Sequence, residues 1–343
     1  MARRTGPVRL DRRRFLAAGA AGFGGAVLLG ACGGDDDDTS GGGDDGGGGG
    51  GTAQASLGLL PIVEVAPTYI AREQGIFGDH GLDVTPEFAE GGAVIIPSVE
   101  SGDYQIGFSN IVSLLLAQEA GASFKILGGG GLTATGDNDD WSQMWVLEES
   151  DIERLADLEG RRVAVNTRSN ALEIVVRAAV EMDGGDHTAI DFVDFPFPDM
   201  RVAMEGGECD AIQYNEPFQT VWQQDGGVRS IGQPFVDAAP GEILAFYFVQ
   251  ANEADSDLAT GFRDALAEAN AVAAGDEAAV RAILPTYLEG LDPAIAEALV
   301  LPAFTEDSIM ESSLERYAEL MVEYGPASEM PIEEMPDWES LLP

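Results

Sequence analysis

Short apolar runs alternate with stretches of helical spacing along most of the chain. The first half predicts three strands and three helices in alternation, with a capping asparagine before the last helix, over residues 57–60, 66–77, 82–88, 93–101, 104–108 and 110–121. Strands this short, with helices between them, are typical of parallel sheets built from βαβ units. The pattern therefore predicts an α/β fold.

The second half of the chain repeats this plan. It predicts strands at residues 162–165, 190–194 and 209–213, with helices at 172–182 and after Pro217. An offset of 105 residues lays 102–110 on 207–215 without a gap. Few letters agree, so chance agreement is an open alternative, but the shared order of elements indicates two lobes of like topology.

The last third predicts one strand and two helices. Residues 243–250 are apolar and strand-like, and we interpret them as the return of the chain to the first lobe. Apolar positions then repeat at helical spacing over residues 262–273 and 314–324, and Gly325-Pro326 ends the second helix. We expect residues 54–147 and 243–343 to form the first lobe and residues 148–242 the second.

The first 31 residues have the features of an export signal. Arg12, Arg13 and Arg14 precede an uncharged stretch over residues 15–29. A helix of that length rises only about 22 Å, which is too short for a bilayer core of roughly 30 Å. Basic residues before a short apolar core predict export. The paired arginines are similar to a twin-arginine signal, and ordinary secretion is the alternative.

A lipid attachment site follows this segment. Residues 29–32, Leu-Gly-Ala-Cys, are similar to the bacterial lipoprotein cleavage box, in which the Cys32 thiol takes up a diacylglycerol. The alternative is a buried apolar cysteine. Residues 33–51 hold eleven glycines and six aspartates, which predicts a flexible tether. We therefore expect residues 1–31 to be a signal peptide and residues 32–53 to be the lipidated Cys32 with its tether.

Composition and charge exclude several classes of function. The chain has 343 residues, 45% of them hydrophobic, which is enough for two lobes with buried cores. It has 60 acidic and 18 basic residues, so it lacks the basic face of a nucleic-acid binder. Its two histidines and two cysteines show no zinc-ligand spacing, and we expect no metal, cofactor or internal disulfide.

Two such lobes, joined by two crossings, predict a ligand cleft between them. Ligands of open parallel sheets bind at the carboxyl ends of the strands, where helix N-termini also offer free N–H groups. The loops at these ends supply ten candidate ligand-binding residues: Pro61, Glu64, Ser109, Asn110, Asn166, Thr167, Asn170, Asn215, Glu216 and Tyr247.

Each candidate also has a simpler structural interpretation. Asn110, Asn170 and Asn215 could cap helices, Glu64 could be a solvated surface charge, and Tyr247 could belong to the core. Arg168, Pro198 and Asp199 are weaker candidates. Amides, hydroxyls and helix ends suit an oxyanion, whereas Glu64 and Glu216 suit an amine or a ring N–H. Together they predict a small zwitterion or a polar heterocycle as the ligand. They supply no nucleophile with a base and an oxyanion hole, so we predict binding without catalysis.

Six stretches carry a family resemblance: LPIVEVAP at 60–67, AREQGIF at 71–77, GLDV at 81–84, SGDYQIGFSN at 101–110, LEGRRVAVN at 158–166 and Glu216-Pro217-Phe218. In this order they resemble the nitrate/sulfonate/taurine-type substrate-binding proteins of ABC importers, which include binders of thiamine pyrimidine precursors. The resemblance implies a type II periplasmic-binding-protein fold, two α/β lobes around a hinged cleft. It also implies delivery of the ligand to a permease driven by a separate ATPase, and we expect the protein to be a monomer.

We therefore expect an exported solute-binding protein, held by lipid on the outer face of the cytoplasmic membrane, that captures a sulfonate- or taurine-like solute. A pyrimidine is the alternative ligand, and a sensory lipoprotein without transport is the alternative role. The pyrimidine synthase relatives of this fold use a cysteine-rich motif and a histidine, and neither has a counterpart in this sequence. An enzymatic function is therefore the least favoured hypothesis.

Overall fold

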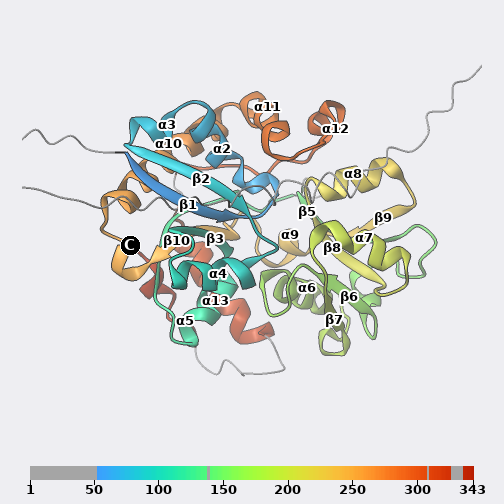
Figure 1. The fold of residues 1–343 in the computed structure, drawn as a ribbon. Coiled ribbons are helices and arrows are strands. Elements are labelled where there is room, and N and C mark those ends of the chain that lie inside the picture. Colours follow the sequence, from blue (N-terminus) through green and yellow to red (C-terminus); the bar gives the residue numbers. More distant parts are fainter. Residues whose placement is uncertain (1–51, 137–139, 307–308, 326–334) are drawn as a thin grey trace, which may run out of the picture. The chain divides into compact units, whose positions relative to one another are not determined.

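The computed structural model describes residues 52–136, 140–306, 309–325 and 335–343, and these residues are organised by two five-stranded sheets (Figure 1). The predicted signal peptide, Cys32 and nearly all of the predicted tether lie outside the described residues. No helix in the described ranges is both long enough and apolar enough to cross a membrane.

The first sheet has the strand order β2-β1-β3-β10-β4. Its strands are β1 (Ala53–Leu59), β2 (Leu82–Phe88), β3 (Ile106–Asn110), β4 (Phe124–Gly129) and β10 (Ala245–Gln250). Strand β1 pairs in parallel with β2 and β3, and β10 runs antiparallel between β3 and β4.

The second sheet has the strand order β7-β6-β8-β5-β9. Its strands are β5 (Ser142–Leu147), β6 (Arg162–Val165), β7 (Asp191–Asp194), β8 (Ala211–Asn215) and β9 (Val228–Gly232). Strand β6 pairs in parallel with β7 and β8, and β5 runs antiparallel between β8 and β9.

The antiparallel strands correct two expectations from the sequence. Each sheet is mixed rather than wholly parallel, and β5, which the boundary at residue 147 assigned to the first lobe, pairs in the second sheet. The geometry of the crossings explains the direction of both strands. The first residue of β5, Ser142, pairs with the last residue of β8, Asn215, and Ala245 of β10 pairs with Asn110 of β3. The chain therefore enters each sheet at the edge where the other strands end.

The predicted internal repeat is visible in the strands. A shift of 105 residues carries β3 onto β8 residue for residue, and it carries β4 and β5 to within a few residues of β9 and β10. The two sheets therefore have the same strand plan, including one inserted antiparallel strand in each.

Helices pack against both sheets and join them. Those of the first half are α2 (Ala66–Glu73), α3 (Ile76–Asp79), α4 (Gly92–Ser101) and α5 (Ile111–Glu119), and those of the second half are α6 (Ala171–Met182), α7 (Phe197–Glu205), α8 (Phe218–Asp225) and α9 (Pro234–Ala238). The C-terminal helices are α10 (Asp257–Gly275), α11 (Glu277–Tyr287), α12 (Pro293–Ala298) and α13 (Glu311–Tyr324). Short 3-10 turns are η1 (Val63–Val65), η2 (Leu155–Leu158), η3 (His187–Ala189), η4 (Ala251–Glu253) and η5 (Trp338–Leu341).

The C-terminal helices contact helices that belong to both lobes. Helices α10 and α11 pack on α2, whereas α12 packs on α8, and α13 packs on both α5 and α6. A hydrogen bond of 2.6 Å from the Tyr324 hydroxyl to the Glu181 carboxylate fastens α13 to α6. The two sheets are therefore linked by these helices as well as by the two chain crossings.

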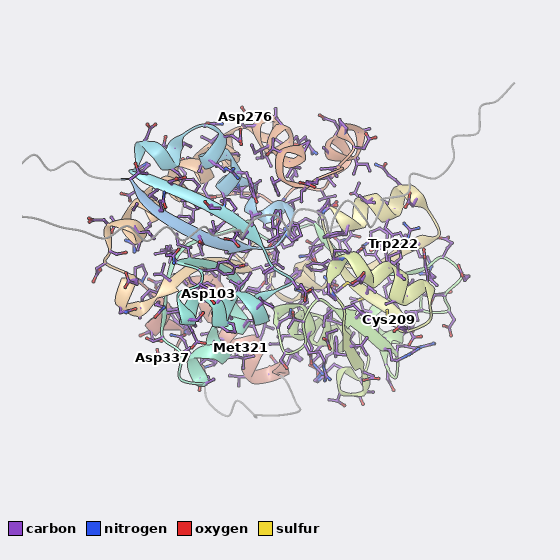
Figure 2. The ribbon with its side chains drawn as sticks, in the orientation of Figure 1. Asp103, Cys209, Trp222, Asp276, Met321 and Asp337 are labelled. Atoms are coloured by element: carbon purple, nitrogen blue, oxygen red, sulfur yellow. The ribbon has the colours of Figure 1, made fainter. Side chains whose placement is uncertain are left out.

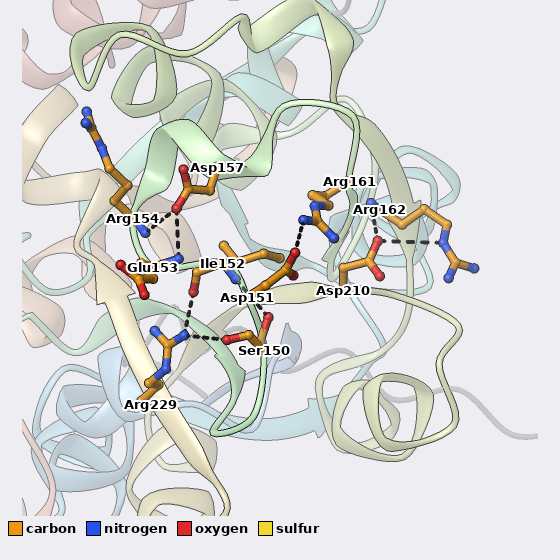
Figure 3. A network of polar contacts seen from close by, with 10 residues as sticks. All are labelled: Ser150, Asp151, Ile152, Glu153, Arg154, Asp157, Arg161, Arg162, Asp210 and Arg229. Atoms are coloured by element: carbon orange, nitrogen blue, oxygen red, sulfur yellow. Dashed lines mark hydrogen bonds and ion pairs between the residues drawn. The ribbon is translucent and has the colours of Figure 1, made fainter.

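Polar contacts order the loop that leads from β5 to β6 (Figure 3). The Arg229 guanidinium on β9 donates to the backbone carbonyls of Ser150 and Ile152, and the Asp157 carboxylate accepts from the backbone N–H of Arg154. These contacts fix the outer end of the second sheet, opposite the edge where Ser142 enters it.

Candidate functional site

A cavity of about 30 Å³ lies where the carboxyl ends of strands from both sheets meet. It is lined by residues at or beyond the ends of β1, β2 and β3 from one sheet and of β6, β7 and β8 from the other. The lining residues are Leu60, Ile62, Glu64, Gly92, Phe108, Ser109, Asn110, Asn166, Leu172, Phe197, Asn215, Leu244 and Ala245. This is the edge at which open α/β sheets bind ligands, and we refer to the cavity as the cleft.

The structure brings five of the ten predicted residues together in this lining. Glu64, Ser109 and Asn110 come from the first sheet, and Asn166 and Asn215 from the second. Their residue types give the cleft one carboxyl group, one hydroxyl and three side-chain amides, and none of the described lining residues carries a positive charge.

Glu64 is the one acidic group in the described lining. It lies on η1, is 1% exposed, and its Oε2 has no hydrogen-bond partner among the described residues. The Asn215 side chain, from the other sheet, lines the same small cavity. Burial raises the pKa of Glu64 to about 8, the Asn215 side chain opposes this, and nearby Asp140 raises the pKa further. The neutral acid is therefore favoured at pH 7, so the solvated surface charge is not what the structure shows.

Ser109 contributes the second unpartnered atom in the cleft. Its side chain is buried, and its Oγ has no hydrogen-bond partner among the described residues. Gly92, the first residue of α4, allows this close packing, because a Cβ at that position would stand 2.5 Å from the Ser109 Oγ. A hydroxyl and the N-terminus of α4 therefore lie side by side at the cleft.

Asn110 is a helix cap that also spans the two lobes. Its Oδ1 accepts from the backbone N–H of Ser113 at 3.0 Å, which caps α5 as the sequence predicts. The same oxygen accepts from the backbone N–H of Ala171, the first residue of α6, at 3.3 Å. Asn110 thus joins the ends of two helices from opposite sides of the cleft.

Asn170 and Thr167 stand directly behind the lining. Asn170 caps α6 by accepting from the backbone N–H of Glu173, and its amide donates to the Asn166 Oδ1 at 2.8 Å. A Cβ on Gly91 would stand 3.0 Å from the Thr167 Oγ1, so this loop packs against the start of α4. Both residues support the site without lining the cleft.

Helix N-termini converge on the cleft in addition to these side chains. Helices α4, α5, α6 and α7 each begin at a lining residue or directly beside one. Their first N–H groups have no partner within the helix and carry partial positive charge. The cleft therefore combines one carboxyl group with an environment that attracts negative groups.

Glu216 does not line the cleft. Its buried carboxylate accepts from the Thr220 hydroxyl at 2.5 Å, from the Gln219 amide, and from the backbone N–H groups of Thr220 and Val300. Burial raises the pKa of Glu216 to about 6, against the lowering effect of these donors. The carboxylate therefore fastens the end of β8 to the segment after α12, a role that the sequence did not suggest.

A second cavity, of about 360 Å³, lies next to Glu216. The three residues that donate to the Glu216 carboxylate, Gln219, Thr220 and Val300, line it. The remaining lining residues come mostly from β5, α8 and β9, and they include Gln143, Trp145 and Arg229. Glu216 thus stands behind this second cavity.

Tyr247 and Pro61 also lie outside the lining. Tyr247 is fully buried on β10, where its hydroxyl is 2.6 Å from the Thr68 Oγ1 and its ring packs between Phe108 and Phe262. This matches the core alternative for the residue. Pro61 is half-buried and lies between two lining residues, Leu60 and Ile62.

The apolar part of the cleft was missing from the sequence prediction. Phe108, Leu172, Phe197 and Leu244 all line it, although none was a candidate. Each lies within three residues of a predicted strand end or helix start, but an apolar residue there does not differ in type from a core residue. The weaker candidates Arg168, Pro198 and Asp199 are exposed and do not line the cleft.

The described residues show no cluster of three histidine, cysteine, aspartate or glutamate side chains that could hold a metal ion. Cys209 precedes β8, and Figure 2 labels it among the elements of the second sheet. Its side chain is buried, and burial raises the pKa of its thiol to about 12. The thiol is therefore un-ionised at neutral pH and is a poor nucleophile.

A family model described as NMT1/THI5 like matches residues 62–296. The chain belongs to this family. The match begins at a lining residue of the cleft and ends within α12, so it includes nine of the ten strands in the described residues. No curated protein matches the chain in sequence.

Solved structures of the same fold include three binding proteins with low sequence identity. The alkanesulfonate-binding protein SsuA from Xanthomonas axonopodis pv. citri, bound to MOPS, has 18% identity and a TM-score of 0.67, over 82% of this chain and 98% of its own. The periplasmic nitrate-binding protein NrtA from Synechocystis PCC 6803 has 14% identity and a TM-score of 0.66, over 81% and 83%.

The third is the ligand-binding component of an ABC-type import system from Staphylococcus aureus, solved with zinc bound. It has 10% identity and a TM-score of 0.70, over 85% of this chain and 96% of its own. Together with the two mixed sheets, these likenesses confirm the predicted periplasmic-binding-protein fold.

The first prediction concerns Glu216. In Glu216→Gln, one terminal atom becomes a donor in a site that holds only donors, so we expect the free energy of unfolding to fall by about 1–3 kcal/mol. Urea denaturation measures the change. Glu208→Gln, at an exposed glutamate before the same strand, is the matched control. Equal stability of the two variants would contradict the assigned role.

The second prediction concerns the pH dependence of stability. The ordinary pKa of Glu64 is 4.5 and its folded value is about 8. Between these values the folded chain keeps a proton that the unfolded chain has lost. This stabilising contribution is complete below pH 4.5, and it is lost at about 1.4 kcal/mol per pH unit as the pH rises towards 8. Asp140, whose pKa burial raises to about 7, adds to the loss.

Urea denaturation of the wild type and of Glu64→Gln at pH 5, 6, 7 and 8, at constant salt, measures this effect. The free energy of unfolding should fall with pH in the wild type and fall less steeply in the variant. Parallel pH curves for the two proteins would show that Glu64 is not the buried acid described here.

Proposed function

We propose that this protein is the extracytoplasmic solute-binding component of an ABC importer, and that it captures a small polar organic solute in the cleft. The single observation that carries the proposal is the pair of unpartnered polar atoms, Glu64 Oε2 and Ser109 Oγ, buried in a cavity lined by both lobes. A buried polar group without a partner costs about 1–3 kcal/mol, and a bound solute would recover that cost.

The polar groups of the cleft favour a solute with both a donor and an acceptor end. The Glu64 carboxyl suits an ammonium or an N–H group, and ionising Glu64 beside a cation removes part of the cost of its burial. The N-termini of α4, α5, α6 and α7 suit an oxyanion such as a sulfonate. A taurine-like zwitterion would use both features, whereas nitrate would leave Glu64 without a partner.

Capture of such a solute requires the lobes to move. A cavity of about 30 Å³ has room for water-sized groups only, so a molecule of the size of taurine needs a wider cleft to enter. The chain crosses between the lobes after β4 and again after β9, and two such crossings allow hinge opening and closure around a ligand.

A thiamine-precursor pyrimidine is the second candidate solute. Two aromatic side chains, Phe108 and Phe197, line the cleft beside its amides and offer faces against which a planar ring can pack. An amino group or ring N–H of a pyrimidine would meet Glu64. The NMT1/THI5-like family match supports keeping this candidate.

The proposed role extends to the cell envelope. The arginines, apolar run and Cys32 box of the sequence support export and anchoring by lipid on the outer face of the cytoplasmic membrane. A monomer in this position would deliver its solute to a permease driven by a separate ATPase. The described lining of the cleft holds one carboxyl group and one serine hydroxyl but no histidine, lysine or cysteine, which favours binding without chemistry.

A thermal-shift screen followed by calorimetry tests the function. The panel is taurine, short alkanesulfonates, nitrate and an aminopyrimidine precursor of thiamine. A solute present at a hundred times its Kd stabilises the protein by about 2.7 kcal/mol, which raises Tm measurably. We expect a shift with a zwitterion or with the pyrimidine and none with nitrate.

Glu64→Gln should weaken binding of the solute found, whereas Glu100→Gln, at an exposed glutamate of α4, should leave affinity unchanged. Absence of a shift with any member of the panel or with a wider set of small polar solutes would overturn the proposed function.

A further inference from the structure

We propose that Ser142 and Gln213 are positioning residues, which hold the Asn215 amide with its N–H group towards the cavity that it shares with Glu64. The inference rests on the proposed function for its consequence in solute capture. Neither Ser142 nor Gln213 lines the cleft, and neither was a candidate in the sequence.

Three side chains of the second sheet form a continuous chain of hydrogen bonds. The Gln213 amide Nε2 donates to the Ser142 Oγ at 2.8 Å, and the Ser142 hydroxyl donates to the Asn215 Oδ1 at 2.7 Å. All three side chains are buried. Because water does not reach them, each depends on its neighbours for hydrogen bonds.

The donors and acceptors along this chain fix the direction of the amide. A serine hydroxyl has one hydrogen, and an amide nitrogen only donates. Since Ser142 accepts from Gln213, its own hydrogen goes to Asn215. The Asn215 Oδ1 is therefore the acceptor, and its NH₂ group is left to face the small cavity that Asn215 and Glu64 both line.

The strand pairing explains why these residues meet. Ser142 is directly opposite Asn215 in the antiparallel pair of β5 and β8, and Met144 is opposite Gln213. Side chains of directly opposed residues, and of residues two positions apart on one strand, share a face of a sheet. Entry of the chain at Ser142 therefore places its hydroxyl between Gln213 and Asn215.

We call the hydrogen-bond chain from Gln213 through Ser142 to Asn215 the relay. Loss of the relay would allow the Asn215 amide to rotate by 180°. The reversed amide would present Oδ1 to Glu64, which the neutral acid could meet by donating its O–H, whereas the ionised carboxylate would set two acceptors against one another. The cost rises when Glu64 is ionised, because hydrogen bonds to a carboxylate are about twice as strong as those between neutral groups. The relay therefore matters most when Glu64 carries its charge.

Other groups around Glu64 set the conditions for a test. Asp140 interacts with Glu64 and titrates in the same range, whereas burial raises the pKa of Tyr247, Tyr287 and Tyr317 above the range of the test. Asp140 also accepts from the backbone N–H of Ser142. The effect of Ser142→Ala in the Glu64→Gln background therefore distinguishes the titration of Glu64 from that of Asp140.

The test is a double-mutant cycle of Ser142→Ala and Glu64→Gln, followed by urea denaturation of the full chain at pH 6 and pH 9. We expect the loss caused by Ser142→Ala, expressed as a ratio of unfolding equilibrium constants, to grow about tenfold between pH 6 and pH 9. In the Glu64→Gln background this growth should disappear. A loss that is independent of pH, or that grows equally in both backgrounds, would overturn the proposal.

Two further variants keep the test decisive. Ser142→Cys replaces the hydroxyl with a weak donor of similar size, and it should show the same trend if Ser142→Ala does not fold. Ser230→Ala, at an exposed serine on β9, should show none. The cycle uses no solute, so it succeeds or fails independently of the solute screen. Where a solute is found, Ser142→Ala should also weaken its binding by roughly tenfold.

Discussion

The central constraint on this structure is the burial of the Glu64 carboxyl group between the two lobes. None of the described residues that line the cleft offers it a positive charge. Glu64 lies in the cleft beside the Asn215 amide, and its Oε2 has no hydrogen-bond partner among the described residues. Burial favours its neutral form, and the amide of the opposite lobe compensates in part for the loss of water. Because residues of both lobes line the cavity around Glu64, the closeness of the lobes depends on the protonation state of this acid. A solute that offers an N–H group or a positive charge would change that state directly.

The arrangement follows from the way the chain crosses between sheets. Each crossing delivers an antiparallel strand into the opposite sheet, and each strand enters at the cleft edge. Ser142 and Ala245 therefore lie beside the last residues of β8 and β3. The crossings place polar backbone and side chains where parallel strands end and helices begin, so the same residues join the lobes and shape the cleft.

Much of this fold was predictable from local patterns. The strands at residues 82–88 and 162–165 were found where the apolar spacing predicted them, and the caps at Asn110 and Asn170 were found in their predicted places. The insertion of β5 was not predictable, because a strand is assigned to a sheet by its distant pairing and not by its own letters. The burial of Glu216 was hidden for the same reason. Its carboxylate is fastened by Val300, 84 residues away in the sequence.

The claim that the lobes close on a solute is tested most directly by the distance between them, measured with and without bound solute. Double electron–electron resonance measures this distance. Spin labels at Glu100 on α4 and Met182 on α6, both exposed, report the two lobes, with Cys32 replaced by serine and Cys209 protected by burial. We predict that the distance distribution narrows to its shorter distance when a solute binds, and that it narrows less in Glu64→Gln at the same solute concentration. A distribution that stays unchanged under saturating solute would contradict it.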